Sequence, residues 1–549
     1  MDRGVAGGDG RVTAARLAPG LVAAALVAGL AGAAILAVAV EAGGLDLPAL
    51  LGDGYVRGVT LFTLKQAALS TLLACLLGLA AARAVHRRAG PRGARALHLL
   101  AALALVMPTT VAAVGIVSVW GRAGWVADAA TVLGLPGPGG ALYGLPGVLL
   151  AHVFFNAPLM ARIFHAALAG IPDGRWRLAA QLGMAGREVW RFVEWPAIRR
   201  VAPGACGLVF LLCFTSFALV LMLGGGPQAS TLEVAIYEAA RLDFDLGKAA
   251  TLSLLQLVLC GVVVLGLARF PTEWLAGRGP SGLGGRIRPD RGERGAKLTD
   301  TATALVAIGI IAAPLAAIIL GGFRTELLSL PGDPVFRAAL MTSVAIAIAS
   351  AGITCALAWS ICEARRTLVL PTRLDRYAGL VGLVDLACAI YLAVPAIVLG
   401  LGAFLTLRGV ADTFALAPLL VLAANVLLSL PFAVRALQGR LAESGARHDR
   451  LCASLGITGW ARLRLVEFPV ARRELGFAAA LSAALSVGDM GVIALFGSDT
   501  FRTLPWLLYQ RNGRYQSDEA AAIALVLLLL SLAFFAGIER IVGGRHAAR

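Results

Sequence analysis

The sequence predicts an all-α membrane protein built from two similar halves, and three observations lead to this fold class. The 549 residues are 59% hydrophobic, with a mean hydropathy of +0.82, whereas soluble domains are roughly 45–50% apolar. Apolar runs long enough to cross a bilayer recur along the whole chain. One polar pattern occurs twice, with Gly183 and Gly456 at equivalent positions 273 residues apart.

The apolar runs predict about twelve transmembrane helices, six in each half. Crossing roughly 30 Å of hydrocarbon takes about 20 mostly apolar residues. The first run is longer than the apolar core of a secretory signal, so we expect it to be retained as a span. In order, the expected spans are 17–40, 60–82, 97–119, 145–168, 201–223, 250–268, 301–321, 337–361, 378–406, 415–438, 475–496 and 520–541.

The short loops alternate in charge, and this alternation gives the orientation. Arginines gather at the N-terminus and in the second and fourth loops, for example Arg87 and Arg88, whereas Glu41 and Asp53 lie in the first loop. Because Lys and Arg are enriched in cytoplasmic loops, we expect both termini on the cytoplasmic side. We therefore attribute the net charge of +16 to loops at the inner membrane surface, and we expect no nucleic-acid partner.

A segment rich in Gly, Pro and Arg, residues 271–299, is expected to be a solvated cytoplasmic linker between the halves. It separates residues 1–270 from residues 300–549. The pairs Pro158/Pro431 and Arg162/Arg435 share the 273-residue spacing of the polar pattern. Since six spans per half is an even number, the halves form a parallel repeat about an axis along the membrane normal.

The polar pattern predicts a helix–glycine–helix elbow in each half, over 171–196 and 443–469. In the first elbow, Pro172 and Asp173 are expected to start a short helix with Asp173 as its N-cap, and Gly183 to end it in a left-handed conformation. A second helix, over 187–195, is expected to end at Pro196. The elbow is either a docking element for a two-fold symmetric partner or an amphipathic interfacial loop.

The second elbow repeats these features. Gly456 is the expected stop, Thr458 the cap of the next helix, and Pro469 the equivalent of Pro196. Both elbows also carry a glutamate two residues before the proline, Glu194 and Glu467. A duplicated element with its spacing preserved favours the docking interpretation.

The elbows resemble the cytoplasmic coupling loop of ABC importer permeases, in which twelve residues separate a glycine from a proline, as they do here. Arg177 and Arg450 stand where that family has glutamate, so a particular salt bridge is not carried over. The resemblance implies that each elbow seats on one of two separate ATPase subunits, which bind ATP and Mg²⁺. The coupling residues it implies are Leu178, Ala179, Gly183, Pro196, Leu451, Ala453, Gly456 and Pro469.

Several segments are similar to thiamine and thiamine pyrophosphate importer permeases. The resemblance implies a subunit of the bacterial inner membrane that translocates a substrate delivered by an extracytoplasmic binding protein. Iron(III) importer permeases share the two-half plan and are the alternative family. The segment that argues most strongly against this alternative is 501–505. The similar segments are 113–125, 151–156, 223–229, 486–491 and 501–505.

Other classes of function are disfavoured by what the sequence lacks. There is no GxxxxGK[ST] phosphate loop, so ATP is not expected to be hydrolysed by this chain. Its eight cysteines are scattered, which predicts neither a disulfide framework nor a metal site, and no cofactor is expected. A membrane-embedded enzyme would need clustered His, Asp or Glu, and a twelve-span secondary transporter would need ion-coupling charges in mid-membrane.

A few polar residues within the spans are candidates for the translocation pathway: Asp489, its counterpart Ser216, and Asn156. A carboxylate in a span is costly unless it is paired. Asp489 is therefore either a pathway carboxylate that attracts a cationic substrate or a structural hydrogen-bond acceptor between helices. Pro108 and Pro395 are expected to kink the backbone.

Overall fold

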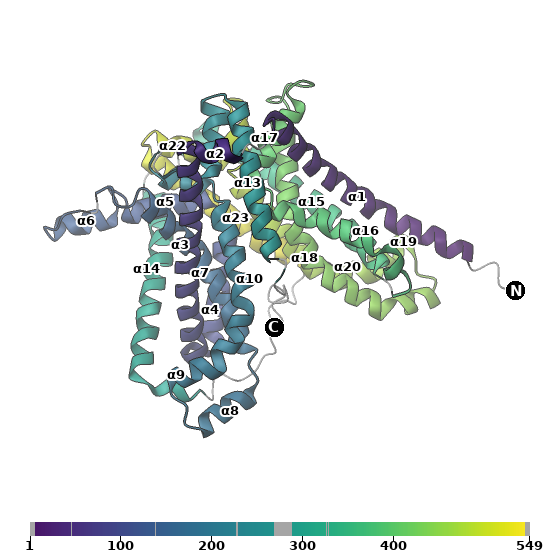
Figure 1. Ribbon diagram of the computed structural model, residues 1–549, viewed down its shortest axis with the longest axis horizontal. Coiled ribbons are helices and arrows are strands. Elements are labelled where there is room, and N and C mark those ends of the chain that lie inside the picture. The colour runs from purple at the N-terminus through teal and green to yellow at the C-terminus, as the bar shows by residue number, and fades with distance from the viewer. Residues whose placement is uncertain are drawn as a thin grey trace.

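A computed structural model describes residues 6–44, 47–137, 139–226, 229–267, 269, 288–324, 327, 329–369 and 371–543 (Figure 1). All regular secondary structure in these residues is helical. Ten of the helices are long and apolar enough to cross a membrane, and shorter apolar helices accompany them. The predicted all-α, multi-span membrane fold is thereby confirmed.

The helices before the middle segment are α1 (Ala6–Glu41), α2 (Leu47–Gly52), α3 (Gly54–Ala84), α4 (Gly90–Val106), α5 (Thr109–Trp120), α6 (Trp125–Val132), α7 (Leu145–Ala169), α8 (Asp173–Gln181), α9 (Gly186–Glu188), α10 (Trp195–Phe214), α11 (Ala218–Leu223), α12 (Leu232–Tyr237) and α13 (Leu246–Leu267). Those after it are α14 (Arg294–Arg324), α15 (Pro334–Leu368), α16 (Pro371–Ala389), α17 (Ala396–Leu407), α18 (Ala417–Ser454), α19 (Gly459–Arg462), α20 (Phe468–Gly488), α21 (Ile493–Phe496), α22 (Leu504–Gly513) and α23 (Ser517–Gly543).

The same packing scheme occurs twice. Helix α3 packs on α7 and α10, and α15 packs on α18 and α20 in the same way. The first helix of each half packs on the other half: α1 packs on α15 and α17, whereas α14 packs on α3 and α5. Figure 1 accordingly shows α1 running along the later half of the chain and α14 standing beside the earlier half.

Small residues make these exchanged contacts possible. A Cβ added to Gly402 of α17 would lie 2.5 Å from the carbonyl oxygen of Ala34 in α1, and one added to Gly115 of α5 would lie 2.8 Å from that of Pro314 in α14. In lipid, where helices gain little from the hydrophobic effect, such close backbone approach is the main source of association. Each half is thus held to the first helix of the other.

Four of the predicted continuous spans are broken: 201–223 between α10 and α11, 475–496 between α20 and α21, and 97–119 and 378–406 each at a proline. Span 97–119 consists of α4 and α5, which are separated at Pro108, and span 378–406 of α16 and α17, which are separated at Pro395 just before Ala396. Proline lacks an N–H and disfavours the helical conformation of the residue before it. Both prolines take the N-cap position of the helix that follows the break, where the sequence had predicted only a kink.

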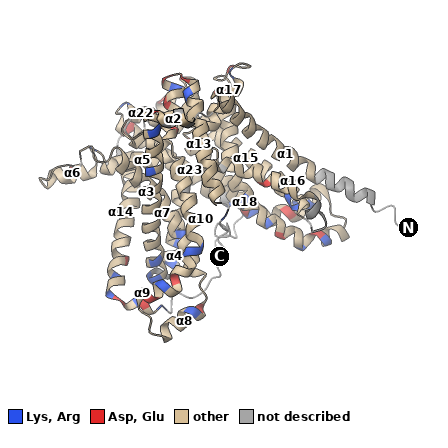
Figure 2. Ribbon diagram, in the orientation of Figure 1, with Lys and Arg blue, Asp and Glu red and all other residues tan. Residues whose placement is uncertain are grey.

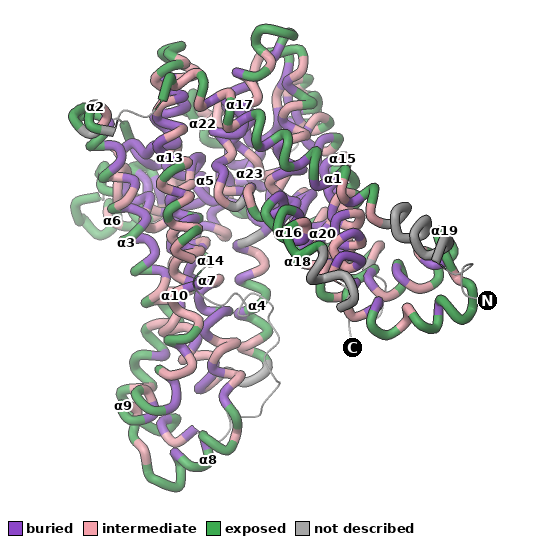
Figure 3. Tube along the Cα trace, turned by 45° about the vertical axis from the view of Figure 1, so that its right-hand side comes forward, coloured by how far each residue is buried: buried purple, intermediate pink, exposed green. Residues whose placement is uncertain are grey.

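The two halves meet at one end of the molecule and diverge toward the other. In Figures 1 and 3, α17, α13 and α22 lie at the end where the halves meet, and α8 and α19 lie at the two separated ends. Figure 2 shows basic residues in blue and acidic residues in red around α8 and α9 at the tip of the first arm. The predicted linker 271–299 lies outside the described residues up to position 287, but residues 288–299 are folded.

Candidate coupling elbows and translocation pathway

The first elbow turns at Gly183, as the sequence predicted. Gly183 has a φ of +64°, and the amide of Met184 donates to the carbonyl oxygen of Ala179 over 3.0 Å. This left-handed conformation strains any residue with a Cβ. The prediction that Asp173 caps α8 was wrong, because Pro172 takes the cap position and Asp173 is the first helical residue.

The chain beyond Gly183 does not end a helix at Pro196. A π-helical turn at Val189–Glu194 leads directly into α10, and Pro196 lies in the first turn of that helix. Since the turn and α10 form one continuous stretch over Gly186–Phe214, the missing N–H of Pro196 removes one backbone hydrogen bond within it. Pro469 occupies the same place in α20.

The second elbow has the same turn but a different approach. Gly456 has a φ of +65°, and Thr458 takes the cap position of α19 without a side-chain hydrogen bond to it. In the first half the chain breaks between α7 and α8 around Pro172, whereas α18 runs without interruption to Ser454. Ser444 and Gly445 occupy the positions equivalent to the break, and neither prevents a continuous helix as proline does.

Both elbows expose the same pair of leucines. Leu178 and Leu451 are each 55% exposed, and Leu182 and Leu455 are each 63% exposed. Paired apolar side chains at a protein surface are typical of a contact with another protein. Arg177, Arg450 and Ala453 are exposed beside them.

The predicted coupling residue Ala179 lies on the opposite side of α8. It is only 1% exposed, and its equivalent in the second elbow is Cys452, which is 2% exposed. In this structure both side chains face their own helix bundle. They hold the elbow in place and do not belong to its outer surface.

The base of the first elbow is a buried cluster of charges around Glu194. The Glu194 carboxylate accepts from Arg83 Nε over 2.8 Å and from Arg288 Nη2 over 2.6 Å. Arg288 also pairs with Asp290 and lies over the Trp176 ring, 4.7 Å from its centre. Burial disfavours the charged form of Asp290, but the hydrogen bonds and charge of Arg288 outweigh it and lower the pKa of that carboxyl.

The base of the second elbow is built around Glu467. Its carboxylate accepts from Arg366 Nη2 over 3.0 Å and from Arg462 Nε over 2.6 Å, and Arg462 also pairs with Asp449. The duplicated glutamate was the sequence signal for both clusters, but its partners could not be deduced. Arg288 in particular lay within the predicted solvated linker.

Asp489 lies at a break between α20 and α21 where the two halves touch. A Cβ on the neighbouring Gly488 would be 3.1 Å from the Cα of Pro108, at the break between α4 and α5. A Cβ on Gly491 would be 2.6 Å from the Cβ of Ala396, the first residue of α17. Three helix breaks, two from one half and one from the other, therefore meet around this residue.

Among the described residues, the Asp489 carboxylate makes no hydrogen bond to another helix. Its Oδ1 accepts from the amide of Gly491, two residues on, over 3.1 Å. Its Oδ2 is shielded and has no hydrogen-bond partner in the part of the chain that the structure describes. Interrupted helices in membrane proteins typically surround ion and substrate sites, so this geometry favours the pathway interpretation over the structural one.

The other two predicted pathway residues belong to the first half. Asn156 is buried in the first half and donates to His152 of its own helix and to Cys213 of α10, over 3.0 and 3.4 Å. Ser216 is half-buried in the short break between α10 and α11. The structure does not show either of them where the halves meet.

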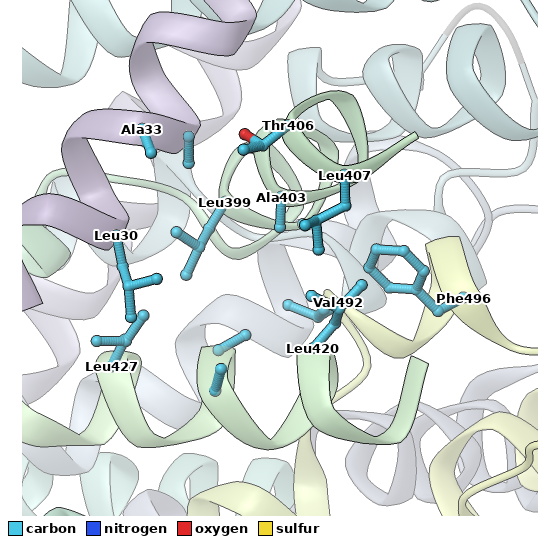
Figure 4. A pocket seen from close by; sticks show the side chains of 14 residues that line it. Leu30, Ala33, Leu399, Ala403, Thr406, Leu407, Leu420, Leu427, Val492 and Phe496 are labelled. Carbon is cyan, nitrogen blue, oxygen red and sulfur yellow. The ribbon is translucent and has the colours of Figure 1, made fainter. Parts of the chain in front are cut away.

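A cavity of about 140 Å³ lies near the Asp489 break, between α1, α17, α18 and α21 (Figure 4). Among the residues that line it, Thr406 alone has a hydroxyl group, and that group donates to the carbonyl oxygen of Gly402 over 2.7 Å. The rest of the lining is apolar, for example Leu30 and Phe496. It offers no partner to a charged solute.

Comparison with known proteins gives several full-length relatives, although no family model matches the chain. The chain is 42% identical over 532 residues to the thiamine transport system permease protein ThiP of Escherichia coli, covering 96% of this chain and 97% of that protein. It is 41% identical over 536 residues to ThiP of Salmonella typhimurium, with 97% of each covered. To ThiP of Brucella abortus it is 40% identical over 520 residues, covering 94% and 93%.

A shorter relative matches only part of the chain. The molybdenum transport system permease protein ModB of Mycobacterium bovis is 30% identical over 240 residues. The match covers 88% of that protein but 43% of this chain.

Proposed function

The chain belongs to the family of thiamine transport system permease proteins, and on that basis we propose that it is the membrane-spanning subunit of an ATP-driven importer of thiamine or thiamine phosphates. The observation that carries this proposal is the identity of 40–42% to three relatives over 94–97% of the chain. The multi-span fold supports it.

Residues 1–270 and 300–549 are two permease halves related by a parallel repeat. The repeated packing of α3 with α7 and of α15 with α18 supports this division. The ModB relative supports the same division, because less than half of this chain matches most of the length of that permease. The exchanged helices α1 and α14 join the halves into one unit.

Each elbow docks on one copy of a separate ATPase subunit at the cytoplasmic side, where both termini also lie. The equal exposure of Leu178 and Leu451 supports a pair of identical partners, because a two-fold symmetric partner needs the same surface twice. ATP and Mg²⁺ are bound by that partner, and the chain itself performs no covalent chemistry. Closure of the partner moves the elbows, and the divergent arms of the two halves follow.

An extracytoplasmic binding protein delivers the substrate at the end where the halves meet. There the exposed residues at or just beyond the ends of the buried helices α12 and α22, over 242–245 and 513–515, form the receiving surface. Beyond them, Asp489 provides a carboxylate at the meeting point of three helix breaks. Thiamine carries a permanently cationic thiazolium ring, and a carboxylate oxygen without a protein partner can compensate that charge as the ring passes.

The test is uptake by proteoliposomes that contain the chain, the ATPase subunit and the binding protein. Radiolabelled thiamine, thiamine monophosphate, thiamine pyrophosphate and ferric iron are supplied separately, with and without ATP inside. We expect ATP-dependent accumulation of at least one thiamine compound and none of iron. Accumulation of iron alone would overturn the substrate, and uptake without ATP would indicate a secondary transporter.

A further inference from the structure

The first elbow is held by residues that come from outside the first half. Arg288, which precedes the first helix of the second half, has a side chain with no exposed surface. Its Nη1 lies 2.8 Å from Nδ1 of His86, just beyond the end of α3, and its Nη2 lies 2.6 Å from Glu194 in the elbow. The guanidinium also stacks on Trp176 of α8.

Three acidic residues extend this contact along the same segment. Asp290 pairs with Arg288 and with Arg87, the latter over 3.2 Å. Glu293 accepts from the amide of Gly186, the first residue of α9, over 2.7 Å. Asp300, on α14, pairs with Arg87 over 2.9 Å and with Arg88.

We call Arg288, Asp290, Glu293 and Asp300 the linker clamp. The clamp joins the elbow, the cytoplasmic end of the span α3 and the helix α14. Helix α14 packs in turn on α5, whose first residue follows Pro108 at the meeting point of the helix breaks. A continuous set of packed elements therefore leads from the first elbow to Asp489.

We propose that the linker clamp is a positioning device that couples movement of the first elbow to the second half of the molecule. Among the residues whose side chains the structure describes, the second elbow shows no such connection, because the arginines on Glu467 come from α15 and from the elbow itself. Removing Arg288 leaves Glu194 and Asp290 buried with fewer partners, which loosens the elbow from α14. The inference rests on the proposed function, since it assumes that the elbow receives the movement of an ATPase.

The test compares Arg288→Gln with Arg291→Gln, a control at an exposed position in the same turn. The complete transporter is reconstituted, and the substrate transported per ATP hydrolysed is measured together with retention of the ATPase subunit. For Arg288→Gln we expect this ratio to fall at least about fivefold, the range of a typical coupling free energy, while the ATPase subunit stays bound. The control should match the wild type.

A second variant covers the case in which Arg288→Gln does not fold. Glu293 is exposed, so Glu293→Ala removes one clamp contact without leaving a buried charge, and we expect a smaller fall in the same ratio, about twofold. An unchanged ratio in every folded clamp variant would overturn the clamp. A wild-type transporter that moves no thiamine compound would instead overturn the proposed function, so the two failures are distinguishable.

Discussion

The two elbows have the same outer surface but different supports. Leu178 and Leu182 are exposed to the same extent as Leu451 and Leu455, and both elbows turn at a glycine in the left-handed region. Beneath this surface, Glu194 is bound by an arginine from before α14 and Glu467 by one from its own elbow. A symmetric partner constrains only the surface that it touches. The residues beneath that surface can differ between the elbows, provided that the buried glutamate in each is paired with two arginines.

The largest expected effect is on the shared surface. Leu178→Asp and Leu451→Asp each place a charge in the proposed contact with the ATPase subunit, and we expect each to lower ATP-dependent uptake at least tenfold, as for a central interface residue. Uptake and co-purification of the ATPase subunit measure this. A large loss for one variant and none for the other would break the equivalence of the two elbows.

The pathway residues should behave unequally. Asp489→Asn removes the charge from a carboxylate that has no partner on another helix, and we expect uptake of thiamine to fall about tenfold, since each 1.4 kcal/mol of lost interaction is a factor of ten. The control Ser216→Ala, at the equivalent position of the first half, should transport normally. Unchanged uptake and unchanged ATPase coupling in Asp489→Asn would remove the pathway role.

The supports should differ in how much they stabilise the fold. Glu194→Ala leaves Arg288 buried without exposed side-chain surface, and we expect a loss of about 3–5 kcal/mol of unfolding free energy. Glu467→Ala should cost less, because Arg366 and Arg462 are 8% and 6% exposed and can be partly hydrated. Thermal unfolding in detergent measures both, and a larger shift for Glu467→Ala would contradict the comparison.

The two turns should respond alike to a small change. Gly183→Ala and Gly456→Ala each force a Cβ into a left-handed conformation, at a cost of about 1–2 kcal/mol. Because φ is nearly the same at both sites, the two losses of stability should agree within error. Thermal unfolding of the single variants tests this, and a neutral substitution at one site would show that its turn is not needed.

The smallest expected effect is that of pH on the linker clamp. The pKa of Asp290 is lowered from its ordinary value of 3.8. Its pairing with Arg288 therefore contributes fully above that value and is lost only as the pH falls through the lower folded-state pKa. Between about pH 7.5 and 9, where the neighbouring His86 imidazole is neutral in both the folded and the unfolded chain, the stability difference between Arg288→Gln and the wild type should be constant. A difference that changes in this range would point to another titrating group.

The sequence predicted those features that local rules determine. The apolar runs gave the membrane spans, and the repeated Gly–x12–Pro spacing gave both glycine turns. The exchange of α1 and α14 was not foreseen, because it depends on the backbone approach of small residues such as Gly402, which leaves no periodic signal. The breaks at Pro108 and Pro395 were predicted as kinks, since a proline alone does not show whether a helix resumes in line.

The candidate sites also divide into features that local sequence patterns predict and features that depend on the final packing. Leu178 and Leu451 could be selected from the duplicated pattern, whereas Ala179, which was predicted as a coupling residue with them, faces the bundle. The partners of Glu194 were beyond prediction, because Arg288 is 94 residues away and lies in a segment whose composition is typical of a linker. Buried charge pairs of this kind depend on the final packing and not on spacing.

The claim that both elbows are docking surfaces for the same partner is tested most directly by site-specific photo-crosslinking. A photoreactive amino acid is placed singly at Leu178, at Leu451, or at Val132, which is 87% exposed on α6 away from the elbows. In the assembled transporter, the account predicts that the first two positions each capture the ATPase subunit and that the third does not. Capture from only one elbow, or from neither, would contradict it.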